Sequence, residues 1–334
     1  MSLEVLCAVV LFAGLTAYAL FGGADFGAGF WMAFALGRRR EDLREAMFHA
    51  MSPVWETNHV WLILVLVTLW TAFPSVFSAI FTGLYLPLVV ALLGIVFRGA
   101  AFAFRHYGKP GENELPATGL VFSVASVVTP FAMGVAIGAV AGGHLDPESG
   151  ETGIFDAWLR PFPIVCGFIA LSITAFLAPA YMLIRPVGEL RDDFRNLAFI
   201  GSLLLGLTTA VAIPVALWDA EAFSDRWDEP GAIAAIAVAV ALGLTSLLVL
   251  SKRLDRLAPV VAAATVVAVL AVWAATQYPY MILPDLRIED AASGDATLEA
   301  FLIVLLVGSV ILVPSLFFLF RLFAIAGPQE TSED

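Results

Sequence analysis

The chain has 334 residues, of which 60% are hydrophobic and only 14% are charged, and its mean hydropathy is +0.92. Soluble proteins are about half apolar and about a quarter charged, so this composition excludes an ordinary soluble enzyme, a disordered chain and a secreted disulfide scaffold. The net charge of -12 offers no cluster of Lys and Arg for phosphate groups, and we therefore expect no nucleic-acid partner. The expected surroundings are a lipid bilayer.

Nine apolar stretches are long enough to cross the membrane as helices, since a crossing helix needs about 20 residues. They cover residues 3 to 22, 56 to 73, 75 to 98, 117 to 142, 161 to 184, 196 to 218, 231 to 251, 258 to 276 and 298 to 323. The second and third are separated only by Phe73 and Pro74, which predicts a tight turn at the membrane surface. No basic residue precedes the first stretch, so we expect a retained helix rather than a signal peptide.

The distribution of positive charge predicts the orientation, because Lys and Arg near helix ends remain on the cytoplasmic side. Fourteen of the 17 Lys and Arg residues, Arg98 and Arg195 among them, are assigned to the odd-numbered connections or to the end of the ninth stretch. The amino terminus is therefore predicted outside and the carboxyl terminus in the cytoplasm. The acidic run from Asp219 to Glu229 is predicted to be a solvated outer loop.

The predicted fold is an all-α polytopic membrane protein with about nine transmembrane helices. Short connections favour antiparallel neighbours, which suggests two four-helix bundles plus one peripheral helix. The corresponding division of the chain is a first bundle over 1–145, a second over 146–276, and an outer loop, ninth helix and cytoplasmic tail over 277–334.

Ionisable groups inside a membrane are costly unless they are paired or hydrated, so they are the first candidates for function. Asp25 follows the first stretch between Gly23 and Gly27, and mostly apolar residues continue as far as residue 36. A helix over residues 3 to 36 would be about 50 Å long at 1.5 Å per residue, longer than the hydrocarbon layer. The helix is therefore expected to tilt, protrude or break, with the glycines as the obvious place for a break.

A second group of polar residues opens the second stretch. Pro53 suits a first helical turn, which places Glu56 near the positive end of the helix, three residues before His59 and on the same face. One interpretation is a protonatable pair, Glu56 and Asp25, at a water-filled cytoplasmic entrance supported by Asn58 and His59. The structural interpretation is that Glu56 caps its own helix while Asp25 is paired at the interface.

The sequence gives little indication of a metal or haem site. Glu56 and His59 match the Glu-x-x-His spacing of di-metal bundles, but no second such motif occurs in any predicted span. His59 is the only histidine placed within a span, so two histidine ligands to one haem are not expected. If this chain takes part in redox chemistry, we expect the metal to be held elsewhere, with no metal ligand and no catalytic residue here.

The segment from Met51 to Ile63 resembles subunit II of the cytochrome bd-type quinol oxidases, which carries Pro-x-Trp-Asp-Gly-Asn-x-Val-Trp-Leu-Ile at this point. The matching residues form the expected structural motif with two glycines of the first helix: Pro53, Trp55, Trp61, Gly23 and Gly27. The resemblance extends to Phe81–Leu88, to Leu93–Arg98 and to Tyr278-Pro279. Nine spans with an outside amino terminus also agree with this family.

The resemblance implies a haem-free subunit, paired with a larger subunit I that holds b-type haems and a d-type haem. Such a complex oxidises quinol, reduces oxygen to water and builds a membrane potential in the respiratory chain. Some members include a very small accessory subunit, and some bind a structural quinone in subunit II. Through the resemblance, Glu56 matches an acidic residue associated with a proton path.

This chain departs from the family pattern at Glu56, where Asp is usual, and at Thr57, where Gly is usual. The first helix also has Gly22 where the family has another acidic residue. These changes affect the expected proton route and the haem set of the partner rather than the topology.

Two other functions fit the sequence. A proton-coupled secondary transporter would use Asp25, Glu56 and kinked helices as a coupling site, but it would be expected to carry polar groups in both halves. A purely structural assembly subunit is not distinguishable from an oxidase subunit by sequence. In each case the expected location is a bacterial or archaeal cytoplasmic (inner) membrane, in contact with the quinone pool for the oxidase.

Overall fold

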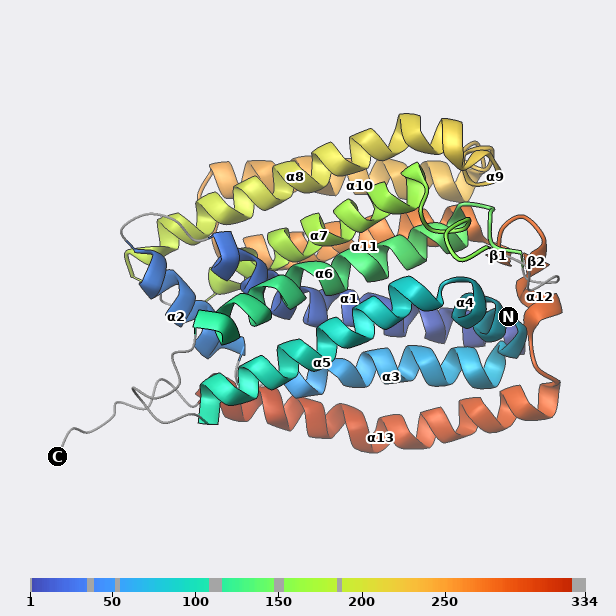
Figure 1. Ribbon diagram of the computed structural model, residues 1–334, viewed down its shortest axis with the longest axis horizontal. Helices are drawn as coiled ribbons and strands as arrows, with labels where there is room; N and C mark the ends of the chain where they lie inside the picture. Colours follow the sequence, from blue (N-terminus) through green and yellow to red (C-terminus); the bar gives the residue numbers. More distant parts are fainter. Residues whose placement is uncertain are drawn as a thin grey trace.

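The computed structural model describes residues 2–34, 39–51, 55–107, 116–146, 153–184 and 188–325, and these residues are mostly helical (Figure 1). The helices are α1 Leu3–Phe34, α2 Arg40–Met51, α3 Trp55–Ala72, α4 Pro74–Gly83, α5 Tyr85–Tyr107, α6 Pro116–Ala141, α7 Pro161–Met182, α8 Leu190–Asp219, α9 Glu221–Ser224, α10 Pro230–Ser251, α11 Ala258–Gln277, α12 Ile288–Ala291 and α13 Asp295–Ile325. A short antiparallel hairpin joins β1, Tyr280–Ile282, to β2, Leu286–Arg287.

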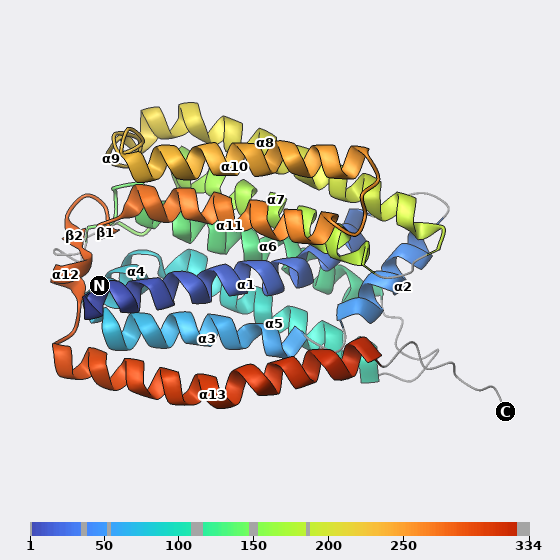
Figure 2. The ribbon, with the colours of Figure 1, turned by 180° about the vertical axis from the view of Figure 1, so that it is seen from behind.

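The all-α membrane fold predicted from the sequence is confirmed. Within the described residues, eight helices are long and apolar enough to cross a membrane, and the bent pair α3 and α4 brings the number to as many as nine. The long helices run side by side in both views, with α13 along one edge next to α3 and with α8 and α10 along the opposite edge (Figures 1 and 2).

The first helix is longer than predicted. The expected span ended at residue 22, whereas α1 continues to Phe34 without a break at its glycines. Those glycines serve packing instead: a Cβ on Gly27 would lie 1.9 Å from the backbone oxygen of Thr174 in α7. Because Gly27 has no side chain, α1 packs directly against the backbone of α7 and continues as one helix through its glycines.

The predicted third span is divided in two. Phe73 is followed by the short helix α4, which is bent by 117° from α3, and the long helix α5 begins only at Tyr85. Pro74 lies in the first turn of α4, where its missing N–H costs no helical hydrogen bond. The predicted turn is present, but α5 then extends nine residues beyond the predicted end at residue 98, to Tyr107.

The two halves of the sequence share a hydrophobic core. Trp31 of α1, Phe176 of α7 and Val266 of α11 belong to one cluster of buried side chains. The Trp31 indole N–H also donates to the backbone oxygen of Ala175 at 2.7 Å. The division into two four-helix bundles therefore stays a prediction, with α1 and α7 in close contact across its boundary.

One helix was missed entirely. Residues 40 to 51 were treated as part of a basic loop, but they form α2, which lies across one end of the long helices (Figure 2). Leu43 and Met47 are one helical turn apart and are both buried, and Arg44 Nε donates to the backbone oxygen of Met32 at 3.0 Å. The signal for this helix was the pair of apolar residues, Leu43 and Met47, four positions apart in a charged sequence.

Ion pairs connect the helix ends on the side of α2. Arg39 donates to Asp193 of α8 at 2.8 Å, and this contact raises the pKa of the Arg39 guanidinium. Arg195 of α8 is buried and pairs with both carboxylate oxygens of Asp255, at 2.8 and 2.7 Å, and also with Asp192. Arg195 was predicted to be a loop cation, and it instead joins α8 to the connection between α10 and α11.

The acidic run that was predicted to be a solvated loop is partly folded. Asp219 ends α8 and is buried, where it accepts hydrogen bonds from Arg160 Nε at 3.0 Å and from the backbone N–H of Phe162 at 2.9 Å. Phe223 of α9 is buried as well. Asp219 is buried because its carboxylate accepts a hydrogen bond from a backbone N–H at the start of α7, a group that has no partner within the helix.

Candidate polar site between α1, α3, α5 and α6

The most deeply buried charges in the described part of the chain are Asp25 of α1 and Arg98 of α5, which are 4% and 1% exposed. Arg98 Nη2 donates to Asp25 Oδ1 at 2.9 Å and to the Asp25 backbone oxygen at 3.0 Å, and Nη1 donates to Oδ2 at 3.2 Å. This two-pronged contact matches the planar guanidinium to the carboxylate. Because both groups are removed from water, each charge is stabilised by its ion pair with the other.

A second set of contacts completes the environment of Arg98. Its Nε donates to Ser126 Oγ of α6 at 3.1 Å, and Ser126 in turn donates to the backbone oxygen of Phe122 at 2.7 Å. The guanidinium carbon lies 4.8 Å from the ring centre of Phe26 and 4.9 Å from that of Phe122. The cation is therefore held between two aromatic faces and joins α1, α5 and α6.

The sequence analysis missed Arg98 because it was treated as a cation of a cytoplasmic loop. Its neighbours contained the signal: the six residues that follow, Gly99 to Phe104, carry no charge. A charged residue with apolar residues on both sides lies within a membrane span, where a partner of opposite charge is expected. Both Asp25 and Glu56 were acids in or next to predicted spans, so charge indicated that Arg98 has a partner but did not choose between the two.

The predicted residues of α3 lie beside α1. Asn58 is buried, and its Nδ2 donates to the backbone oxygen of Phe21 at 3.3 Å. The indole of Trp61 stacks on the ring of Phe21, with 6.2 Å between ring centres and 19° between planes. Asn58 and Trp61 therefore fix how α3 sits against α1.

His59 faces Tyr18 of α1, with 6.2 Å between ring centres and 41° between planes. His59 Nδ1 and the Tyr18 hydroxyl are both buried and have no hydrogen-bond partner among the described residues. Buried polar atoms are nearly always satisfied by protein or water, so two unsatisfied atoms in adjacent helices indicate a place for water.

The remaining predicted residues are placed as follows. Glu56 and Trp55 are the first residues of α3, but their side chains are outside the described part of the chain, as is all of Pro53. Gly23 is buried, and a Cβ added to it would lie 3.4 Å from Leu177 of α7, an ordinary contact, whereas Gly27 makes the close approach to α7 described above. Asp25 is therefore paired with Arg98, whereas no contact of the Glu56 side chain is described.

Among the described residues, no three His, Cys, Asp or Glu side chains are grouped in a way that could hold a metal ion. Cys7 and Cys166 are free thiols. This observation covers only the described residues, so the absence of a metal site from the whole chain stays a prediction.

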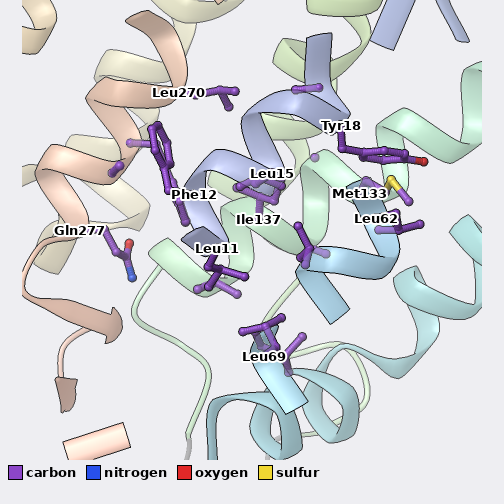
Figure 3. A pocket seen from close by; sticks show the side chains of 18 of the residues that line it. Leu11, Phe12, Leu15, Tyr18, Leu62, Leu69, Met133, Ile137, Leu270 and Gln277 are labelled. Atoms are coloured by element: carbon purple, nitrogen blue, oxygen red, sulfur yellow. The ribbon is translucent and has the colours of Figure 1, made fainter. Parts of the chain in front are cut away.

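An apolar cavity of about 430 Å³ lies between α1, α3, α6 and α11. Figure 3 shows Tyr18 and Gln277 at opposite sides of it, with Leu11, Phe12 and Leu15 of α1 between them. Three polar atoms of lining residues are buried and have no partner in the described structure: the Tyr18 hydroxyl oxygen, Trp273 Nε1, a donor, and Gln277 Oε1, an acceptor. This combination suits an apolar molecule with a small polar group.

A family model described as cytochrome bd terminal oxidase subunit II matches residues 3–323. The chain belongs to this family. The cytochrome bd-I ubiquinol oxidase subunit 2 of Escherichia coli (strain K12) is 30% identical over 203 residues, which is 59% of this chain. That match covers only 53% of the Escherichia coli protein, about half of its length.

A longer match is made to a protein of Bacillus subtilis (strain 168) with a provisional assignment as a cytochrome bd menaquinol oxidase subunit II. It is 24% identical over 322 residues, covering 92% of this chain and 91% of that protein. Among solved structures, a chain of the bd oxidase from Geobacillus thermodenitrificans has a TM-score of 0.79 at 20% identity, with 98% of this chain and 100% of that chain covered. The structural match shows that the fold of the family extends over nearly the whole chain.

Proposed function

We propose that this protein is subunit II of a bd-type quinol:oxygen oxidoreductase of the respiratory chain in a bacterial cytoplasmic membrane. The observation that carries the proposal is the family match over residues 3–323. The helices long enough to cross a membrane agree with this location. Because the relatives are named for ubiquinol or menaquinol oxidases, the quinol class is proposed without a choice between them.

The haems belong to a partner in this proposal. On the family resemblance, b-type and d-type haems lie in subunit I, which performs the oxidation of quinol and the reduction of oxygen to water. This chain has no catalytic residue of its own and supports subunit I, and a very small accessory subunit completes the complex. The exposed apolar faces of the long helices provide area for both lipid and partner contacts.

The contribution of this chain to the reaction is a proton path that begins at Glu56. Glu56 lies at the start of α3, at the end of the molecule that carries α2 and the basic connections. Asn58 and His59 follow it on α3, and the charged pair of Asp25 with Arg98 lies in the adjacent α1 and α5. A carboxyl group near solvent with polar groups behind it is suited to accept protons and to pass them inward.

We also propose that a structural quinone occupies the apolar cavity. The aliphatic lining suits an isoprenoid tail, and Trp273 Nε1 supplies a donor for a ring carbonyl. Organic extraction of the purified complex tests this directly. We expect one quinone per complex in the unmodified protein and a lower quinone content in a Trp273→Phe variant whose haem content is normal. An unchanged quinone content in that variant would contradict this placement.

The test of the proposed function begins with the complex purified in detergent. We expect a haem-bearing partner to copurify and to show reduced-minus-oxidised bands in the visible spectrum that the separated chain lacks. If the chain purifies without any haem-bearing partner, the oxidase assignment is wrong and a transporter becomes the leading alternative.

The proton path is tested by Glu56→Gln, which removes the titratable proton and preserves shape. Quinol-driven oxygen consumption should fall by about tenfold or more while the haem content remains normal, because proton-transfer groups contribute at least this much. Glu299→Gln is the matched control, since Glu299 is an exposed residue near the start of α13. An unchanged rate in the assembled Glu56→Gln complex would leave this chain only a structural role.

A further inference from the structure

Two neighbouring rings at the contact between α1 and α3 each carry an unsatisfied polar atom. Within the part of the chain that the structure describes, the Tyr18 hydroxyl and His59 Nδ1 are buried without a hydrogen-bond partner, and the ring centres are 6.2 Å apart. Folded proteins rarely leave such atoms unsatisfied, because their desolvation is not repaid. Water molecules between the two rings would satisfy both groups and connect them to each other.

The register of the two helices determines where this pair lies. Asn58 donates to the backbone oxygen of Phe21, so α3 runs antiparallel to α1 and brings His59 beside Tyr18. Tyr18 is about 24 Å along α1 from its end at Phe34, close to the middle of the helix. Glu56 precedes His59 by three residues, so both lie on one face of α3. The order from the helix end inward is therefore Glu56, His59 and Tyr18.

Asp25 is poorly suited to be the next carrier in this series. Both of its carboxylate oxygens accept hydrogen bonds from Arg98, which occupies them and fixes the orientation of the carboxylate. Asp25 lies two helical turns from Tyr18 on the same face of α1. The pair is therefore a fixed source of electric field beside the two unsatisfied groups.

We propose that the His59 imidazole and the Tyr18 hydroxyl, linked by water, form the inner section of the proton path, with the Asp25 and Arg98 pair as a fixed charge beside it. This inference rests on the proposed function. In each transfer, His59 gains a proton on one ring nitrogen and releases one from the other. The Tyr18 oxygen likewise accepts one proton as its own O–H bond breaks, so each group is neutral again after the transfer, without electron transfer. The His59 imidazole is then in its other tautomer and the Tyr18 O–H points the other way, so both must reset before the next proton passes.

The test compares Tyr18→Phe and His59→Gln in the assembled oxidase, each of which removes proton-transfer chemistry with little change in size. We expect oxygen consumption and proton uptake into reconstituted vesicles to fall about tenfold, with a larger solvent isotope effect in D2O and with normal haem spectra. Tyr85→Phe is the matched control, because it removes a hydroxyl from a ring that is exposed at the start of α5. Its rate and isotope effect should equal those of the unmodified protein.

The results separate this inference from the proposed function. If Glu56→Gln slows turnover but Tyr18→Phe and His59→Gln do not, the relay is wrong and the proposed proton entrance stands. If Tyr18→Phe slows turnover only with loss of haem, and with no change in isotope effect, its role is structural and the relay is also wrong. If all three variants leave turnover unchanged, the proton path of the proposed function fails together with the relay.

Discussion

The helices α1 and α10 are both strongly apolar and long enough to cross a membrane, yet they are used in different ways. α1 buries twelve of its 32 residues, including the continuous run from Asp25 to Gly29. α10 buries four of its 22 residues, and half of its ten Val, Ile and Leu side chains are exposed. Apolar composition therefore identifies a membrane helix, while the distribution of glycine and charge distinguishes a helix packed among others from one that faces lipid.

The largest expected effect follows from breaking the charged pair of α1. Replacement of Arg98 by Met leaves the buried Asp25 carboxylate unpaired, which should lower the free energy of unfolding by about 3–5 kcal/mol. Thermal unfolding of the purified complex in detergent measures the loss. The double variant Arg98→Met and Asp25→Leu should recover most of the stability, because no buried charge remains. Equal instability of the single and double variants would show that packing, rather than charge, is the cause.

A smaller loss is expected from Gly27→Ala, which adds a methyl group where α1 meets the backbone of α7. The added carbon would lie 1.9 Å from the Thr174 oxygen, so the helices must separate, and we expect a loss of about 1–3 kcal/mol.

The matched control is Gly243→Ala in α10, where no atom lies within 4 Å of the added carbon. Because alanine favours helix by up to about 1 kcal/mol over glycine, this variant should unfold at the same or a higher temperature. If both substitutions lowered the unfolding temperature equally, the contrast between the two helices would be lost.

The smallest effect is expected from Ser246→Ala, which removes a hydrogen bond between the Ser246 and Thr265 hydroxyl groups of α10 and α11, 2.8 Å apart. Hydrogen bonds between membrane helices contribute about 0.6 kcal/mol on average. Ser251→Ala is the control, because the Ser251 hydroxyl donates only within its own helix. Both values come from unfolding of the same complex, and a loss at Ser251 as large as that at Ser246 would contradict the prediction.

The positions of the membrane helices were largely predictable because they depend on the length of apolar runs. Each of the nine predicted stretches overlaps a long helix, with the third divided between α4 and α5. The ends were less predictable: Asp25 and Arg98 interrupted the apolar pattern and were taken to mark the ends of spans. In each case the charge lies inside a longer helix because it has a partner on a neighbouring helix.

The candidate site could be predicted only in part. Asp25, Asn58 and His59 were identified as polar residues in or near apolar stretches, and all three lie along the contacts of α1. Tyr18 was not identified, because a tyrosine in an apolar helix gives no signal until its hydroxyl is known to be unsatisfied.

By itself, the sequence determined the helical membrane class and the family, since these depend on apolar run length and local motifs. Only the tertiary structure decided that Asp25 meets Arg98, 73 residues later, and that Tyr18 faces His59. The physical reason is that these contacts depend on the relative rotation and register of separate helices. Rotation and register are set by close packing at positions such as Gly27, which a linear pattern of hydropathy does not record.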